Sequence, residues 1–114
     1  CGGTLTASSG TITSPNYPNS YPNNLNCVWT ISAPPGYRIE LKFTDFDLES
    51  SDNCTYDYVE IYDGPSTSSP LLGRFCGSEL PPPIISSSSN SMTVTFVSDS
   101  SVQKRGFSAR YSAV

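Results

Sequence analysis

The sequence has no histidine, a single methionine and no pair of cysteines at the CxxC spacing. Histidine is the commonest general base and a frequent metal ligand, and CxxC pairs mark many zinc and redox sites, so these chemistries are not expected. A GxSxG motif, which marks the nucleophile of many hydrolases, is also absent. Paired acids alone would serve a glycosidase only in a defined cleft, which the sequence does not indicate. We therefore expect no enzymatic activity.

Long apolar runs and a large basic fraction are lacking too. No apolar stretch approaches the ~20 residues that a membrane-spanning helix needs, so we expect no membrane insertion. Charged residues make up only 14% of the chain, and the net charge is −4. This acidic balance argues against a nucleic-acid partner and favours cations and basic proteins.

The residues that are abundant favour short strands and turns. Ten prolines, eight glycines and seven tyrosines accompany long Ser, Thr and Asn runs in 114 residues. Alternating apolar and polar residues predict strands at 27–31, 37–43, 55–62, 71–76, 92–97 and 107–111. The repeated X-Pro steps of residues 1–25 predict one edge strand and loops. We predict a single all-β domain over residues 1–114, folded as an antiparallel β-sandwich of two sheets.

The alternation in segment 37–43 does not continue into the acidic residues that follow. Phe46 and Leu48 occupy the opposite parity from Leu41 and Phe43. A strand accommodates such a change by a bulge or by ending near Thr44. The acidic segment is therefore expected to begin where regular strand pairing fails.

The four cysteines are more typical of disulfides than of a metal site, which indicates an oxidising compartment. Three connectivities are possible. The simplest pairs Cys1 with Cys27 and Cys54 with Cys76, which closes two separate local loops. In the loop-entropy model, each such bond stabilises the fold by roughly 3 kcal/mol.

One further feature agrees with an extracellular setting, and another with a module excised from a longer chain. The sequon Asn53-Cys54-Thr55 makes Asn53 a candidate glycosylation site. The chain begins directly at Cys1, without the pattern of a signal peptide. We therefore expect a module excised from a larger extracellular protein, either secreted or the ectodomain of a membrane protein.

A dense group of carboxylates surrounds Cys54 and predicts a bound cation. Glu49 and Asp57 lie on either side of Cys54, whose disulfide is expected to anchor the loop. Asp99 lies in a second polar loop, and we expect these three acids to meet. Ca²⁺ takes six to eight oxygen ligands, which carboxylates, carbonyls and water together provide. Soft metals are not expected without histidine or free cysteine. We expect Ser101 or Val102 to add a backbone oxygen.

The other nearby acids are expected to be solvated. They are Asp45, Asp47 and Asp52. Asp47 is the best candidate among them for supporting the metal ligands or facing a bound partner.

Several short motifs occur in a characteristic order. They are Cys1-Gly2-Gly3, Ser14-Pro15-Asn16-Tyr17-Pro18, Phe46-Asp47-Leu48-Glu49, Cys54-Thr55-Tyr56-Asp57-Tyr58-Val59, Gly73-Arg74-Phe75-Cys76-Gly77, Phe96-Val97-Ser98-Asp99 and Gly106-Phe107-Ser108-Ala109-Arg110-Tyr111. With these motifs the chain resembles the CUB domain family over nearly its whole length. The resemblance implies an extracellular, jelly-roll-like β-sandwich with the disulfides Cys1–Cys27 and Cys54–Cys76.

The resemblance also implies a calcium site. A subset of the family binds calcium through positions that match Glu49, Asp57 and Asp99, with Tyr21 hydrogen-bonding to the site. In some of these relatives an Asn follows the last Asp by three residues. Here that position is Val102, which could offer only its carbonyl oxygen.

The leading functional hypothesis is a calcium-dependent protein-binding module. In family members of this kind, a Lys or Arg of an extracellular protein partner reaches the carboxylates that Ca²⁺ holds in place. The expected contact residues are Glu49, Asp57, Asp99, Tyr21 and Tyr56. The alternative is a carbohydrate-binding module of the seminal-adhesin or mucosal scavenger type, which would stack glycans on exposed tyrosines near the acidic loops.

Overall fold

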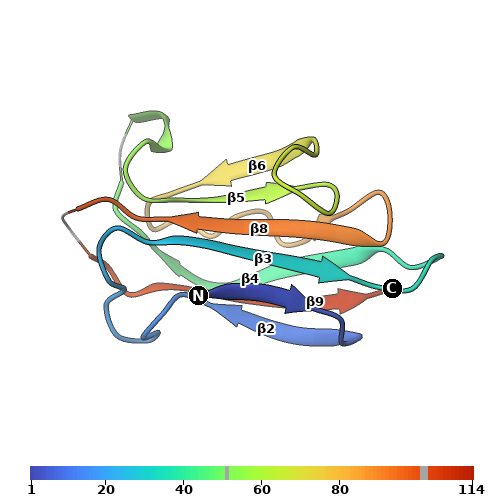
Figure 1. Ribbon diagram of the computed structural model, residues 1–114. Helices are drawn as coiled ribbons and strands as arrows, with labels where there is room; N and C mark the ends of the chain where they lie inside the picture. Colours follow the sequence, from blue (N-terminus) through green and yellow to red (C-terminus); the bar gives the residue numbers. More distant parts are fainter. Residues whose placement is uncertain (51, 101–102) are drawn as a thin grey trace.

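The computed structural model describes residues 1–50, 52–100 and 103–114, which form two packed β-sheets (Figure 1). The five-stranded sheet has the order β1-β3-β8-β5-β6, and the four-stranded sheet has the order β2-β9-β4-β7. The elements are β1 (Gly2–Leu5), β2 (Ser9–Thr13), β3 (Asn26–Ser32), β4 (Ile39–Asp47), the 3₁₀ turn η1 (Asp52–Cys54), β5 (Tyr58–Tyr62), β6 (Leu71–Phe75), β7 (Ile85–Ser86), β8 (Ser91–Val97) and β9 (Gly106–Ala113). Among the described residues, no helix is long and apolar enough to cross a membrane. The predicted all-β sandwich is confirmed.

The core lies between the two sheets and is centred on Phe107 of β9. Its ring meets those of Trp29, Phe43 and Phe96 edge to face, with centroid distances of 6.0, 5.8 and 5.3 Å. Such pairs add about 0.5–1.5 kcal/mol beyond the area they bury. Aromatic residues from β3, β4, β8 and β9 therefore join the two sheets, and Trp29 faces the core as its alternating strand predicts.

The change of parity in β4 is produced by a bulge. The register of β4 against β9 shifts between Phe43 and Asp45, which turns Phe46 inward, where it is 3% exposed. The predicted irregularity is confirmed. Tyr37, however, lies before β4 and is 48% exposed, so the prediction that the strand begins there is wrong. The backbone NH of Tyr37 donates to the carbonyl of Pro34, which places Tyr37 in the preceding turn.

The N-terminal segment contributes two edge strands where the sequence predicted one. β2 pairs antiparallel with β9, while β1 pairs parallel with β3, so the sandwich is not purely antiparallel. The Cys1–Cys27 disulfide joins the starts of β1 and β3, which agrees with their parallel pairing. The second disulfide is Cys54–Cys76, so the simplest connectivity is confirmed.

Candidate functional site

Three carboxylates from distant parts of the chain meet at one end of the sandwich. Glu49 follows the end of β4, Asp57 precedes β5 and Asp99 follows β8, and these strand ends lie together (Figure 1). One carboxylate oxygen from each residue lies within 4.8 Å of the other two. The structure thus brings together the three acids that the sequence singled out.

Asp57 is the buried centre of this group. It is 0% exposed, and its Oδ1 accepts a hydrogen bond of 2.8 Å from the backbone NH of Asp99. Its Oδ2 accepts the hydroxyl hydrogen of Tyr21. The Tyr21 oxygen in turn accepts a bond of 3.3 Å from the backbone NH of Glu49. Asp57 and Tyr21 therefore position the backbone at both of the other carboxylates.

Tyr21 is held from several sides. Its side chain is only 1% exposed, its ring packs edge to face on Phe96 at 5.0 Å, and its backbone NH donates to the carbonyl of Lys104. Burial and the bond to Asp57 raise the pKa of Tyr21 well above its usual value. The geometry fits the expected hydrogen-bonding role of Tyr21. Tyr21 is not a surface aromatic residue, because its loop folds the ring into the core.

The electrostatics of the three acids favour a cation. Desolvation, followed by the charges of Asp99 and Asp57, raises the pKa of Glu49. Burial likewise raises the pKa of Asp57, although its hydrogen bonds from Tyr21 and from the Asp99 backbone oppose this effect. Glu49 Oε1 is buried and has no hydrogen-bond donor among the described residues. A buried, unpaired carboxylate oxygen costs about 1–3 kcal/mol or more, and a bound cation would remove that cost.

The donor set fits calcium. The ligands offered by Glu49, Asp57 and Asp99 are all carboxylate oxygens, which hard cations such as Ca²⁺ prefer. The three supply part of a shell of six to eight oxygens, which leaves places for backbone carbonyls and water. Ser101 and Val102, the predicted backbone ligands, lie outside the described residues.

Asp47, expected beside the site, is turned toward a cation of the chain itself. Its Oδ2 lies 3.8 Å from Arg105 Nη1. Tyr56 is 52% exposed, and Asn53 is exposed in a left-handed conformation with φ of 61°. Both residues flank Cys54 and remain accessible for the roles that the sequence suggested.

Asp45 was expected to be solvated, and that expectation is wrong. Arg105 donates to both of its carboxylate oxygens, at 2.8 Å from Nε and 2.7 Å from Nη2, and Tyr17 donates its hydroxyl at 2.6 Å. Arg105, and then Tyr17, lower the pKa of Asp45 to about 2. Arg105 is 60 residues from Asp45, and no local pattern in the sequence indicates this pairing.

A second unpredicted cluster supports the loop that carries the acids. Arg74 donates from Nε and Nη2 to Glu60 Oε2, at 2.9 and 2.7 Å, and lies 4.2 Å above the centre of the Tyr58 ring. Its Nη1 donates to the carbonyl of Cys54 at 3.3 Å. Tyr62 donates to Glu60 Oε1 at 2.8 Å. Arg74 therefore links β5 and β6 to the half-cystine that anchors the acidic loop.

Comparison with known proteins gives matches that cover nearly the whole of this chain. The sequence profile of the CUB domain matches residues 1–111. Human Tolloid-like protein 2 is 54% identical over 111 residues, which are 97% of this chain and 11% of that protein. The chain thus spans about a tenth of the length of such relatives.

Solved structures agree with this assignment. The full extracellular region of zebrafish Gpr126/Adgrg6 matches all of this chain with 15% of its own length, a TM-score of 0.90 and 43% identity. The MASP-1 CUB2 domain, whose structure was determined bound to Ca²⁺, matches 98% of this chain with 99% of its length, a TM-score of 0.86 and 40% identity. Together with the two disulfides, these matches identify an extracellular domain. The chain belongs to the CUB domain family.

Proposed function

We propose that this chain is a calcium-dependent protein-binding module, not an enzyme, and that Glu49, Asp57 and Asp99 hold its ion. The observation that carries the proposal is the meeting of three carboxylate oxygens within 4.8 Å, with one buried Glu49 oxygen that has no donor among the described residues. The calcium-bound CUB2 domain of MASP-1, 40% identical to this chain, supports the choice of metal.

The three acids have different roles in this proposal. When bound, Ca²⁺ supplies the positive charge that lets three carboxylates remain ionised at close range. Asp57 is buried and holds the neighbouring backbone, so it does not reach a partner. Glu49 and Asp99 are half-buried and keep part of their surface in solvent. Their outward oxygens accept hydrogen bonds from a Lys ammonium or Arg guanidinium of the partner.

This arrangement revises the expected contact surface. Tyr21 and Asp57 support the site from the buried side. Glu49 and Asp99 are partly exposed to solvent, and Tyr56 is exposed. The alternative of glycan stacking needed exposed tyrosines beside the acidic loops. Because Tyr21 is buried, it is not available for stacking, and this alternative is the weaker proposal.

Residues 1–114 serve in this proposal as one module of a larger extracellular protein. Human Tolloid-like protein 2 is about nine times as long as the matched segment, which covers 11% of its length. The activity of any such parent would belong to its other parts, and this chain would supply recognition.

Calorimetric titration with calcium tests the site directly. We expect a dissociation constant of ~0.1–1 mM, as in other extracellular modules. Glu49→Gln and Asp99→Asn each remove one negative charge with little change of shape, and both should weaken calcium binding at least tenfold. Glu79→Gln is the matched control, because Glu79 is exposed and lies outside the group of three. Equal calcium affinity in all four proteins would refute the site.

Partner binding is tested separately. The immobilised domain is exposed to extracellular fluid with calcium or with a chelator, and the captured proteins are compared. Capture that depends on calcium and is lost in Asp99→Asn supports recognition through the ion. Capture that is unchanged by chelator and by Asp99→Asn would make the ion purely structural.

A further inference from the structure

The outer face of the four-stranded sheet carries two cations that lie directly opposite each other. The strand register pairs Lys42 of β4 with Arg110 of β9, and pairs Arg110 with Thr11 of β2. Both cationic side chains are exposed, while their chain neighbours Leu41 and Tyr111 are buried in the core. Opposed residues of antiparallel strands have Cα atoms about 4.5–5.5 Å apart. Lys42 and Arg110 therefore belong to one patch of surface.

Neither cation is neutralised within the part of the chain that the structure describes. The ion pairs there use Arg74 and Arg105, and neither Lys42 nor Arg110 takes part in one. Glu40 lies on the same face of β4 and is not within ion-pair distance of either. Like charges directly opposite on neighbouring strands repel, so this pairing costs stability. An anion bound by both side chains would remove the repulsion.

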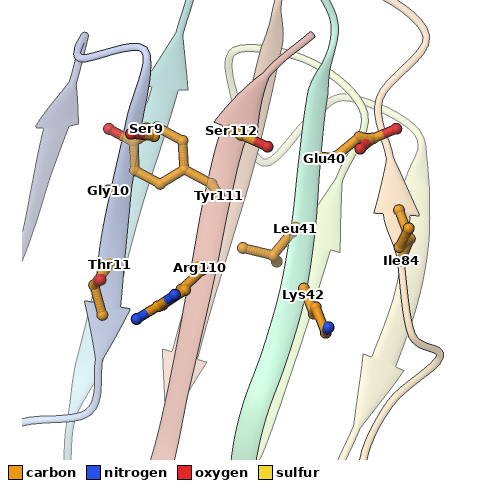
Figure 2. Close-up of a pocket in the computed structure, with 10 residues that line it drawn as sticks. All are labelled: Ser9, Gly10, Thr11, Glu40, Leu41, Lys42, Ile84, Arg110, Tyr111 and Ser112. Atoms are coloured by element: carbon orange, nitrogen blue, oxygen red, sulfur yellow. The ribbon is translucent and has the colours of Figure 1, made fainter.

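The two cations line an open hollow with a volume of about 440 Å³ (Figure 2). Figure 2 shows Arg110 extending from β9 toward Thr11, whereas Lys42 extends to the side of β4 that faces away from β9, so the two cationic ends diverge. The remaining border is largely polar. It includes Ser9 and Ser112, the carboxylate of Glu40 and the 57% exposed Ile84. The hollow thus combines two positive groups and one carboxylate with hydroxyls that can donate and accept hydrogen bonds.

We propose that this hollow binds a sulfated oligosaccharide. Arg110 pairs with one sulfate group through two parallel hydrogen bonds and Lys42 pairs with another, while the Ser and Thr hydroxyls bind sugar hydroxyls. This site lies outside the group of Glu49, Asp57 and Asp99 and needs no calcium.

The surface fits an anionic sugar better than an acidic peptide. Extended peptides add to a free strand edge, but β9 is paired on both sides, with β2 and β4. Folded protein partners insert apolar or aromatic anchors into pockets, and Ile84 is the exposed large apolar residue that this hollow provides. Charge and hydroxyl groups therefore carry recognition here.

The test is an NMR titration in chelator, so that the calcium site does not contribute. Heparin tetrasaccharide is the probe, and the amides of Thr11, Lys42 and Arg110 are expected to shift. Lys42→Gln and Arg110→Gln should each weaken binding at least fivefold, and the double variant should lose it. Arg38→Gln is the control, because Arg38 is an exposed cation outside the hollow and its loss changes the net charge equally.

Four results would overturn the proposal. An equal loss in Arg38→Gln would mean that binding follows net charge alone. A hexaglutamate peptide that bound as tightly as heparin tetrasaccharide would assign the hollow to acidic proteins. Inorganic sulfate that bound as tightly would show that the sugar is not recognised. Desulfated tetrasaccharide that bound as tightly would show that the sulfate is not recognised. Thermal unfolding checks the fold of each variant, and Lys42→Gln is expected to unfold no earlier than the parent because it relieves a repulsion.

Discussion

The hydroxyl of Tyr21 donates a hydrogen bond to Asp57 inside the protein, although the two residues lie 36 positions apart. The same oxygen accepts the backbone NH of Glu49. One buried tyrosine thus connects the N-terminal loop to two of the three acids of the proposed calcium site. This connection explains why a loop residue far from the acidic segment matters to it.

Replacing Tyr21 with Phe should separate this hydrogen-bonding role from packing. The ring keeps its contact with Phe96, but Asp57 loses a donor. Loss of a partner to a buried carboxylate costs about 1–3 kcal/mol, so we expect a lower free energy of unfolding. Calcium affinity should fall several-fold. Urea denaturation and calorimetry measure the two effects, and a variant unchanged in both would contradict the role of Tyr21.

The Cys54–Cys76 disulfide should support calcium binding as well as the fold. Next to it, the backbone NH of Leu48 donates to the carbonyl of Gly77 at 2.9 Å, which ties the start of the acidic loop to the same place. Replacing both cysteines with Ser should cost roughly 2–5 kcal/mol of stability and weaken calcium binding.

The other disulfide provides the control for this prediction. Cys1–Cys27 joins the starts of β1 and β3, so the corresponding double Ser variant should lose stability but keep its calcium affinity while folded. If the two double variants showed the same calcium affinity as the parent, the acidic loop would not depend on its disulfide.

Arg74 should act on the same loop from β6. Arg74→Gln removes its ion pair with Glu60 and its bond to the Cys54 carbonyl. Because the Arg74 side chain is 37% exposed and that of Glu60 only 12%, we expect a modest loss of about 1–2 kcal/mol. Calcium affinity should also fall. Arg74→Lys keeps the charge but not the two-pronged geometry, and it should lie between the parent and Arg74→Gln in thermal unfolding.

Acid should destabilise the domain through Asp45. Arg105 lowers the pKa of Asp45 to about 2 in the folded protein, whereas an unfolded Asp titrates near about 3.9. The unfolded state therefore binds more protons as pH falls, so this contribution is full above about pH 5 and is lost as pH falls through about 2. Arg105→Gln should be less stable near neutral pH and lose less stability on acidification.

Urea denaturation at about pH 7, 4 and 3 measures this difference between the parent and Arg105→Gln. Glu49 and Asp57, whose raised pKa values act in the opposite direction, are present in both proteins and cancel in the comparison. Arg38→Gln controls for net charge. Parallel acid profiles for the parent and Arg105→Gln would contradict the assignment to Asp45.

Asn53 should carry a glycan when the domain passes through a secretory pathway. It is exposed in the turn beside Cys54, and its sequon is complete. Mass spectrometry of secreted protein checks occupancy. Because the turn is close in sequence to Glu49 and Asp57, the glycan should slow partner binding, and Asn53→Gln should bind faster. Unmodified Asn53 in the secreted protein would contradict this prediction.

The sequence by itself determined the elements that depend on local patterns. Alternation along 27–31 and 39–43 specifies which side chains face the core, so the sandwich and the burial of Trp29 were predictable. The parity change before Phe46 likewise predicted the bulge in β4. The grouping of Glu49, Asp57 and Asp99 was anticipated from acidic loops and a family resemblance, and the structure places their oxygens together.

Tertiary structure decided the contacts that depend on strand register and loop closure. The pairing of Arg105 with Asp45 joins residues 60 positions apart. Lys42 lies opposite Arg110 because of the register in which β4 and β9 pair. Tyr21 carries no local signal of burial, yet its loop folds across the end of the sandwich onto Phe96. Periodicity reports on neighbours a few residues away, whereas the partner of a polar side chain is set by which distant segments pack together.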